Sequence, residues 1–451
     1  MGRARAAHTE GDGTRETPVG GVGPARSRPE PSRWRWSSGR RSAGRRAWRL
    51  WVAGDALLLL AFWSVLYAGP IGEPSAPHDA GSAGLPGGRA HAAMPMAPEA
   101  RATARPEARA GRPEAGRPGL LSFSPVVAPP PPGARAPVRQ DRLARALARA
   151  EELAPLSGLL VKQGDQLVVE RYYRGMEGDR STNLKSISKT LLSPLVGIAI
   201  EQGLLEGPDQ PLEELLPEYF ARLDGDGPDA AAKRAITLHH VLSMTSGLES
   251  TSFGNYGAWV SSRDWVWDQL RRPMVCTPGC FEYSTGSTHL ISAILTARTG
   301  ESLRAWAERS FFGPLGIALP EWDRDPQGRY LGGNNMALTP RQLLRVGEVF
   351  LHGGRWEGRQ LVPEDWIELS WRPRATSPWN GHRYGYLWWS EDWGGHAAHF
   401  AWGYGGQYLV IVPSLDLVAV VTSSLGRTPR GHTRRLRDFF DDYLIPAFSD
   451  G

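Results

Sequence analysis

The sequence predicts a mixed α/β (α+β) domain built on one antiparallel sheet that takes strands from both ends of the domain. Segment 158–175 reads as two strands near its start, and segments 383–390 and 405–424 read as strands near its end. The chain between them, up to about residue 370, is rich in helical patterns. Because hairpins join antiparallel strands, we expect a sheet flanked by helices, with a helical insert subdomain to one side.

Local patterns justify each element. In chain order they predict a polar helix at 141–153, a hairpin turning at Gly164-Asp165, an apolar helix at 185–205, a helix capped by Thr339, a hairpin turning at Pro413-Ser414, and a closing helix at 434–448 that covers the sheet. The helix at 185–205 is apolar nearly all round, so we expect it to be buried, with an irregularity at Pro194.

The chain before the globular domain divides into three parts. Residues 1–49 form a polar, Arg-rich arm, residues 50–69 are apolar apart from Asp55, and residues 70–140 are rich in Pro, Ala, Gly and Arg. The last part has a composition that packs no core and is read as an extended linker. This leaves residues 141–451 as the globular domain.

The apolar segment 50–69 is long enough to cross a bilayer, which takes about 20 residues. Arginines precede it, so the N-terminus is expected in the cytoplasm and the globular domain outside it. We interpret the segment as an uncleaved single-pass anchor in a bacterial inner membrane, with a cleaved signal as the alternative. The globular domain would then be periplasmic or otherwise extracytoplasmic.

Charge argues against a nucleic-acid partner. The net charge is +5, but residues 1–140 hold 20 Arg against 10 Asp plus Glu, so the remainder of the chain carries a charge of −5. The globular domain therefore lacks the basic excess of a nucleic-acid-binding domain.

The two cysteines, Cys276 and Cys280, are separated by Thr277-Pro278-Gly279. Two cysteines alone do not make a tetrahedral zinc site, and no metal or cofactor is expected. Outside the cytoplasm they are able to form a short-loop disulfide; the alternative is two free, small apolar residues.

Lysine is scarce in this chain, and two of its four lysines flank one serine. Of 52 basic residues only Lys162, Lys185, Lys189 and Lys233 are lysine. Unlike arginine, a buried lysine is able to lose its proton and act as a base. Lys189 follows Ser186 by three residues, a spacing that puts both side chains on one helix face. The pair therefore predicts a serine nucleophile with a lysine base.

Other hydrolytic schemes have less support. The sequence contains no G-x-S-x-G, H-E-x-x-H or G-x-x-x-x-G-K-[ST] motif. A Ser–His–Asp triad that uses His396 or His399 is retained as an alternative.

Six ordered blocks of the sequence resemble the serine β-lactamase and penicillin-binding-protein superfamily, in its class C-like branch, which also holds carboxylesterases and 6-aminohexanoate-oligomer hydrolases. The blocks are LKSISKTLLSPLVGIAIEQGLL, ITLHHVLSMTSGL, PGCFEYSTGSTHLISAIL, GGNNMALTPRQLLRVGEVFLHGGRWEGRQLVPEDWI, YGYLWW and AWGYGGQYLVIVPSLDLVAVV. The resemblance covers about residues 150–425 and implies a β-lactamase/DD-peptidase-like fold.

The resemblance implies roles for individual residues. Ser186 is the nucleophile, Lys189 its activating partner, and Tyr283 the tyrosine of the second motif. We expect a neighbouring ammonium to favour the phenolate of Tyr283, which would carry a proton from Ser186 to the leaving group. The backbone N–H groups of Ser186 and Tyr404, with Gly403 at the strand edge, are expected to hold the oxyanion.

Two positions depart from the family pattern. Thr285 stands where the family has an asparagine that contacts substrate, and Ala401-Trp402-Gly403 stands where it has K-T-G or H-x-G. The cation that often meets a substrate carboxylate is therefore missing, which favours ester or amide substrates without that charge. Trp402 and Trp388 are expected to line an apolar substrate cleft.

The sequence thus predicts an extracytoplasmic serine hydrolase that cleaves a small ester or amide through an acyl-enzyme on Ser186. A β-lactamase or D-Ala-D-Ala carboxypeptidase is the alternative within the enzyme class. A non-catalytic cell-envelope binding or sensor protein on the same fold is the alternative from another class.

Overall fold

The computed structural model describes residues 136–223, 228–426 and 428–450. The predicted segments 1–49 and 50–69, and nearly all of the predicted linker 70–140, lie outside these residues. Within the described ranges, no helix combines the length and apolarity needed to cross a bilayer.

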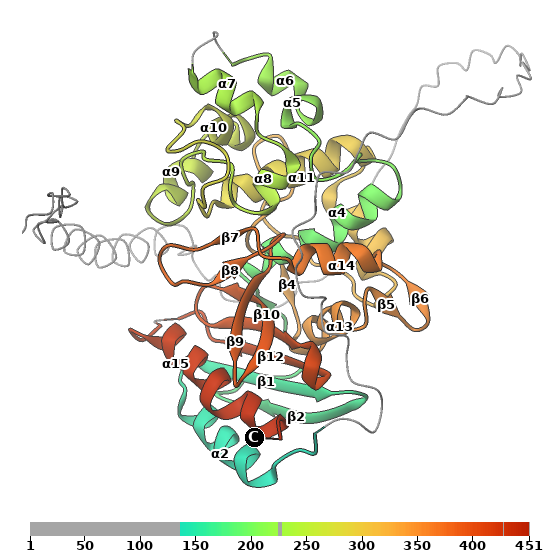
Figure 1. Cartoon of the computed structure of the whole chain (residues 1–451), viewed down its shortest axis with the longest axis vertical. Helices are drawn as coiled ribbons and strands as arrows, with labels where there is room; N and C mark the ends of the chain where they lie inside the picture. The colour runs from blue at the N-terminus through green and yellow to red at the C-terminus, as the bar shows by residue number, and fades with distance from the viewer. Residues whose placement is uncertain (1–135, 224–227, 427, 451) are drawn as a thin grey trace, which may run out of the picture. The chain divides into compact units, whose positions relative to one another are not determined.

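The core of the domain is an eight-stranded sheet with the strand order β2-β1-β12-β11-β10-β9-β8-β7. The strands are β1 (Leu156–Gln163), β2 (Gln166–Tyr172), β7 (Ala375–Thr376), β8 (Arg383–Tyr384), β9 (Trp389–Trp393), β10 (His396–Gly403), β11 (Gln407–Val412) and β12 (Leu417–Ser423). All neighbouring pairs are antiparallel. The prediction of an antiparallel sheet assembled from both ends of the domain is confirmed: β1 pairs with β12 (Figure 1).

Both predicted hairpins are present, but one predicted strand is divided in two. β1 and β2 turn at Gly164, and β11 and β12 are joined by the short 3₁₀ helix η3 (Pro413–Leu415). The predicted strand 383–390 is instead divided into β8 and β9. At the break Leu387 has a φ of 65° and donates its backbone N–H to the carbonyl of Leu242, so the chain leaves the sheet there to pack on the helical part.

Helices cover both faces of the sheet. Gly347 of α13 (Pro340–Leu351) packs against Leu409, whereas the ring of Phe440 packs 5.3 Å from that of Tyr408. Successive residues of a strand point to opposite faces, so α13 and the C-terminal helical segment lie on opposite sides of β11. Thr339 caps α13 as predicted: its hydroxyl accepts from the N–H of Gln342 at 3.2 Å.

A second group of helices forms the predicted insert and lies beyond one end of the sheet (Figure 1). It includes α5 (Leu212–Leu215), α6 (Pro217–Phe220), α7 (Pro228–Arg234), α8 (Leu238–Leu242), α9 (Tyr256–Val260) and α10 (Trp265–Arg271). Further helices of the domain are α2 (Gln140–Glu152), η1 (Phe253–Asn255), α11 (Thr285–Thr299), α12 (Leu303–Ala307), η2 (Glu308–Phe312), α14 (Glu364–Trp371), α15 (His432–Phe439), η4 (Phe440–Leu444) and η5 (Ile445–Phe448).

The predicted apolar helix 185–205 is two helices, α3 (Ile187–Thr190) and α4 (Leu192–Glu201). Pro194 is the third residue of α4, where the lack of a backbone N–H removes no intrahelical bond. It is therefore tolerated without breaking the helix. As predicted from its apolar composition, α4 is almost entirely buried.

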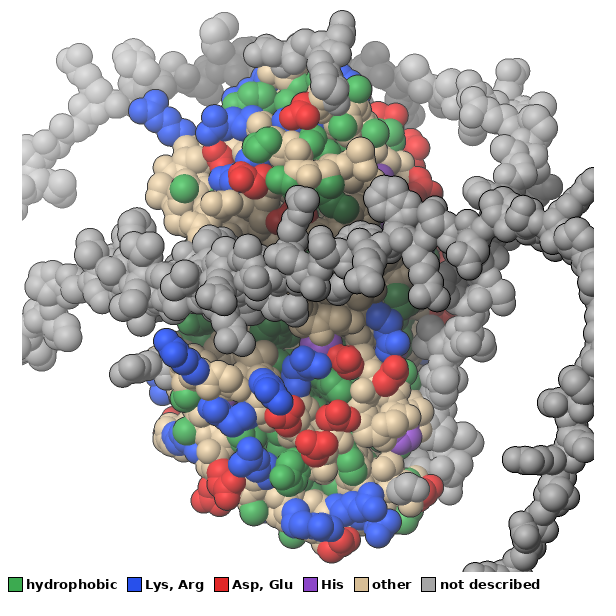
Figure 2. Space-filling model, turned by 60° about the vertical axis from the view of Figure 1, so that its left-hand side comes forward, with side chains coloured by type: hydrophobic (Ala, Val, Ile, Leu, Met, Phe, Trp, Pro, Cys, Tyr) green, Lys and Arg blue, Asp and Glu red, His purple; other side chains and the backbone are tan. Residues whose placement is uncertain are grey.

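Two two-stranded sheets complete the described chain: β3 (Thr182–Asn183) with β4 (Ala337–Leu338), and β5 (Arg355–Trp356) with β6 (Arg359–Gln360). On the lower part of the face in Figure 2, Lys and Arg side chains are interspersed with Asp and Glu side chains.

Candidate active site

Ser186 lies at the junction between the small β3–β4 sheet and helix α3. It is the N-cap residue of α3 and is partly exposed, so solvent reaches it. Lys185, immediately before it, has a φ of 52°, a left-handed conformation that is uncommon outside glycine. The side chain of Asn183 accepts a hydrogen bond from the N–H of Lys185 at 2.9 Å and holds this turn. The turn thus presents Ser186 at the start of a buried helix.

Lys189 is 1% exposed, and its amine has three uncharged partners. Its Nζ lies 3.2 Å from Oγ of Ser186, 3.1 Å from Oγ1 of Thr285 and 2.7 Å from the carbonyl oxygen of Gly333. Burial lowers the pKa of Lys189 to about 7, because water no longer solvates the ammonium. A substantial fraction of Lys189 is therefore neutral near pH 7, as a base must be.

The three contacts also orient the neutral amine. A neutral amine has two hydrogens and one lone pair. The carbonyl of Gly333 only accepts, so one N–H must donate to it, and the second N–H donates to Oγ1 of Thr285. The lone pair then faces Ser186, whose hydroxyl is the remaining neighbour. This arrangement lets Lys189 take the hydroxyl proton of Ser186.

Tyr283, the third residue of the predicted catalytic group, lies beside Ser186 and Lys189. Its hydroxyl is hydrogen-bonded to Ser186, and its ring centroid lies 5.1 Å from Nζ of Lys189. Burial raises the pKa of Tyr283 well above its usual range, although the bond to Ser186 opposes the shift. The expectation of a phenolate is therefore wrong for the free protein: Tyr283 is a neutral phenol, suited to donate a proton.

Thr285 is the first residue of α11 and is fixed by Ser252. The N–H of Thr285 donates to Oγ of Ser252 at 2.9 Å, and the two hydroxyl oxygens also lie 2.9 Å apart. The threonine that replaces the family asparagine thus contacts Lys189 directly. Its short side chain reaches the amine because α11 begins beside α3.

The carbonyl of Gly333 belongs to a turn that packs tightly on α11. A Cβ atom at Gly333 would lie 2.1 Å from Oγ1 of Thr288, and one at Gly332 would lie 2.3 Å from the carbonyl oxygen of Thr288. Only glycine allows so close an approach. The position of the third partner of Lys189 is therefore set by α11.

A buried histidine–aspartate pair supports the same turn. Nδ1 of His289 accepts from the N–H of Gly332 at 3.4 Å, and Nε2 lies 3.0 Å from Oδ2 of Asp325. Burial lowers the pKa of His289, so the ring is neutral and its single proton sits on Nε2, donating to Asp325. Asp325 thereby fixes the tautomer that receives Gly332.

Gly403, the last residue of β10, lies against the segment that precedes Ser186. A Cβ atom at Gly403 would lie 2.2 Å from the carbonyl oxygen of Leu184. The end of β10 is therefore next to the segment that leads to Ser186, and Tyr404 follows with a 63% exposed side chain. The predicted oxyanion role of Gly403 and Tyr404 stays a prediction.

The two tryptophans predicted to line the cleft differ in environment. Trp402 is partly exposed, and its ring lies 6.2 Å from that of Trp389, which in turn stacks on Tyr283 at 5.7 Å. Trp388 is completely buried, 4.7 Å from the ring of Phe350. The prediction that Trp388 lines the cleft is therefore wrong, because its side chain is enclosed in the core.

The histidines of the alternative triad have other partners. His399 lies 3.0 Å from Oγ of Ser390 and stacks on Trp371, and His396 lies 2.9 Å from Oγ of Ser414. These placements do not support a histidine base for Ser186. Among the residues that the structure describes, no cluster of three or more His, Cys, Asp or Glu has the arrangement of a metal site.

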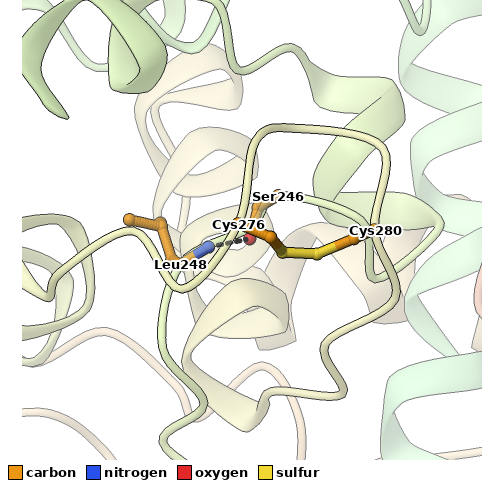
Figure 3. Close-up of a disulfide and its surroundings, with 4 residues drawn as sticks. All are labelled: Ser246, Leu248, Cys276 and Cys280. Atoms are coloured by element: carbon orange, nitrogen blue, oxygen red, sulfur yellow. Dashed lines mark hydrogen bonds between the residues drawn. A yellow bond between two sulfur atoms is a disulfide. The ribbon is translucent and has the colours of Figure 1, made fainter. Parts of the chain in front are cut away.

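Cys276 and Cys280 form a disulfide, with their Cα atoms 6.5 Å apart (Figure 3). The loop they close packs on the turn Ser246–Leu248, where a Cβ at Gly247 would lie 2.2 Å from the carbonyl oxygen of Cys276. The N–H of Leu248 donates to Oγ of Ser246 at 3.4 Å. Tyr283 follows Cys280 by three residues, so the disulfide anchors the segment that leads to it.

The sequence did not predict the residues that position Lys189 and its partners. Gly333 acts through a backbone carbonyl. Ser252 and Asp325 lie outside the six sequence blocks, and His289 lies within the third block but had no predicted role. The only signal was the glycine pair in GGNN, which marks a close backbone approach.

With this geometry in place, comparison with known proteins assigns the family. Residues 144–440, more than half of the chain, match the Beta-lactamase family. The chain belongs to the Beta-lactamase family. The name denotes the family and not an activity on β-lactams. The match confirms the superfamily that the six sequence blocks predicted. This family is a family of hydrolases.

The proteins to which this chain is similar carry different names. The chain is 26% identical over 315 residues to a 6-aminohexanoate-dimer hydrolase from Paenarthrobacter ureafaciens, which covers 64% of this chain and 78% of that protein. Its fold is similar to that of EstCE1, a hydrolase with promiscuous acyltransferase activity (TM-score 0.54, 17% identity, 67% of this chain and 100% of that chain). The fold is also similar to that of an octameric penicillin-binding protein homologue from Pyrococcus abyssi (TM-score 0.52, 17% identity, 66% of this chain and 76% of that chain).

Proposed function

We propose that this protein is a serine hydrolase that cleaves an ester or amide through an acyl-enzyme on Ser186. The observation that carries the proposal is the fully buried amine of Lys189, which has a pKa of about 7 and lies 3.2 Å from Oγ of Ser186. A buried lysine with uncharged partners destabilises the fold. Its placement beside a reachable serine hydroxyl is explained by catalysis.

The reaction follows from these positions. Oγ of Ser186 attacks the substrate carbonyl carbon while its proton passes to Nζ of Lys189, and a tetrahedral oxyanion forms. The hydroxyl of Tyr283 protonates the leaving atom, and the Lys189 ammonium restores the proton of Tyr283. The bond to the leaving group breaks, and an acyl-enzyme remains on Ser186. Water then repeats the sequence in reverse and releases the acid.

The substrate class rests on the residues at the third motif. Ala401 occupies the position of the family lysine or histidine and is completely buried, so it offers a carboxylate no cation. This supports an uncharged ester or amide. The name of the Paenarthrobacter relative, a 6-aminohexanoate-dimer hydrolase, supports an amide bond as the target but not the absence of charge, since such a dimer carries a carboxylate.

The test is hydrolysis of p-nitrophenyl esters by the wild-type protein and by Ser186→Ala. We expect turnover only in the wild type, and mass spectrometry to find a fluorophosphonate adduct on Ser186. Full activity in Ser186→Ala would refute the proposal. Covalent labelling by a fluorescent penicillin, without ester turnover, would favour a β-lactamase or carboxypeptidase instead. A protein that neither turns over esters nor reacts with the fluorophosphonate would fit a binding or sensor role.

We also propose that the hydrolase domain is extracytoplasmic and attached to the membrane by residues 50–69. The apolar segment with preceding arginines supports this, as does the Cys276–Cys280 disulfide, since disulfides persist in oxidising compartments. Fractionation of cells that produce the full chain tests it. Recovery of the intact protein in the cytosolic fraction would contradict it.

A further inference from the structure

Among the described residues, six large apolar side chains are exposed, and three of them lie on segments of the active site. Phe253 follows Ser252, Tyr404 follows Gly403, and Trp379 lies in the loop between β7 and β8. The other three, Leu167, Val275 and Tyr443, lie elsewhere. Exposed aromatic rings that gather at one place mark a binding surface.

Two of these rings contact the catalytic tyrosine. The ring of Trp379 lies 5.9 Å from that of Tyr283 in an edge-to-face arrangement, and the ring of Phe253 lies 6.4 Å from it. Phe253 and Trp379 are also 5.7 Å apart, edge to face. They are 49% and 41% exposed, whereas Tyr283 is 8% exposed. The two rings thus form an aromatic surface directly over Tyr283.

The backbone around each ring is fixed: Phe253 has an unusual backbone conformation, and hydrogen bonds hold the loop that carries Trp379. Phe253 has a φ of 55°, which is an outlier for a bulky residue. Its neighbour Ser252 is bonded to Thr285, so this conformation is tied to the site. In the β7–β8 loop, the N–H of Trp379 donates to Oγ of Ser377 at 3.4 Å, and the N–H of Gly381 donates to the carbonyl of Ser377 at 3.0 Å. Strained and fixed exposed residues are typical of ligand contacts.

We propose that Phe253 and Trp379 bind the leaving group of the substrate, and that this group is an uncharged aromatic alcohol or amine. The inference rests on the proposed function. In that reaction the hydroxyl of Tyr283 protonates the leaving atom, so the leaving group lies next to Tyr283. A flat apolar group there stacks on or edges against Trp379 and Phe253, and aromatic contacts favour such geometries.

Three esters separate this inference from its alternatives. 2-Naphthyl butyrate has an aromatic leaving group, trifluoroethyl butyrate has a small one, and trifluoroethyl 2-naphthoate has its ring on the acyl side. For Trp379→Ala we expect the KM for 2-naphthyl butyrate to rise about tenfold, the effect of about 1.4 kcal/mol of lost aromatic contact. The other two esters should lose far less. Phe253→Ala should show the same pattern.

Tyr443→Ala is the matched control, because it removes a similarly exposed ring from η4. It should leave all three esters unaffected. Equal losses on the three esters in Trp379→Ala, or a loss confined to trifluoroethyl 2-naphthoate, would overturn the inference. If the wild type hydrolyses none of them, the proposed function fails. The binding surface is then judged by calorimetric titration of Ser186→Ala with 2-naphthol: weaker binding on adding Trp379→Ala supports it, and unchanged or absent binding refutes it.

Discussion

The amine of Lys189 lies 2.7 Å from the carbonyl oxygen of Gly333, 144 residues further along the chain. Together with Oγ1 of Thr285, this carbonyl takes up both hydrogens of the neutral amine and directs its lone pair to Ser186. A general base must be deprotonated, and its lone pair must point at the proton that it takes. Burial provides the first condition, and these two acceptors provide the second.

Replacement of the base tests this relationship. Lys189→Arg keeps a basic side chain of similar reach, but a guanidinium stays protonated and takes no proton from Ser186. We expect kcat on p-nitrophenyl acetate to fall by about 10²–10⁴-fold, the usual contribution of general base catalysis. The residual rate should equal that of Ser186→Ala. A Lys189→Arg protein that retained a tenth or more of the wild-type kcat would show that another group is the base.

The pH dependence of activity follows from the pKa of Lys189, which burial lowers from 10.5 to about 7. The neutral amine is the active form, so kcat/KM should rise with pH through about 7 and reach a plateau above it. Initial rates between pH 5 and pH 9, corrected for the rate of Ser186→Ala, give the profile. A midpoint near 10 would mean that Lys189 is protonated at neutral pH in the free protein.

The same pKa predicts a stability penalty. Between pH 7 and pH 10.5 the unfolded chain holds a proton on Lys189 that the folded protein does not hold. Stability therefore rises with pH across this window through this group, and the full penalty is present below pH 7. Lys189→Met removes the penalty, and we expect it to stabilise the protein by roughly 1–3 kcal/mol at pH 7, after loss of the amine hydrogen bonds.

Urea denaturation of Lys189→Met and of the wild type at pH 7 and pH 10 measures this difference. The gain should be smaller at pH 10 than at pH 7. A gain that is equal at the two pH values, or a loss at both, would contradict the assignment of a depressed pKa to Lys189.

The sequence predicted the sheet and the contact between Lys189 and Ser186, because both follow from local patterns, whereas the prediction for Tyr283 came from the family resemblance. Apolar strands at either end of the domain lead to the β1–β12 pairing, and the i, i+3 spacing brings Lys189 to Ser186. Burial is not local. The expected phenolate of Tyr283 was wrong because the sequence does not show how completely the ring is enclosed.

The supporting residues were not predictable for a related reason. The contact of Gly333 with Lys189 is made by a backbone carbonyl, which every residue has. His289 lies in α11 and Asp325 in the loop after η2, so the two residues of this pair are 36 positions apart in the sequence. Trp388 and Trp389 are neighbours of the same type, and only the irregular entry to β9 decides that Trp388 is in the core and Trp389 beside Tyr283.

Thr285 gives a test of the lone-pair orientation. Thr285→Val keeps the shape of the side chain but removes the hydroxyl that accepts from Lys189 at 3.1 Å. The amine then has one acceptor fewer and is free to rotate, so we expect kcat to fall about tenfold with little change in KM. Thr285→Ser retains the hydroxyl and is the matched control. Stopped-flow measurement of the acylation burst locates the effect. Equal kcat values for the Val and Ser variants would remove Thr285 from the mechanism.

The buried pair of His289 and Asp325 is expected to control the turn that holds Lys189. Oδ1 of Asp325 accepts the backbone N–H groups of Gln327 at 3.0 Å and Arg329 at 2.7 Å. In Asp325→Asn the amide oxygen must stay with these two donors, so the new NH₂ group faces Nε2 of His289. That ring nitrogen then has to accept, and the proton moves to Nδ1, where it opposes the N–H of Gly332.

We therefore expect Asp325→Asn to displace the Gly332–Gly333 turn and to lower kcat by about tenfold. The ammonium of Lys189 also loses its carbonyl acceptor, so its pKa falls and the acidic limb of kcat/KM moves to lower pH. Arg329→Gln is the control, since it breaks the 3.3 Å ion pair with Asp325 but leaves the contact to His289. Both variants should lose stability in urea denaturation. Only Asp325→Asn should change kcat and the pH profile, and parallel changes in the two variants would reduce the pair to a structural role.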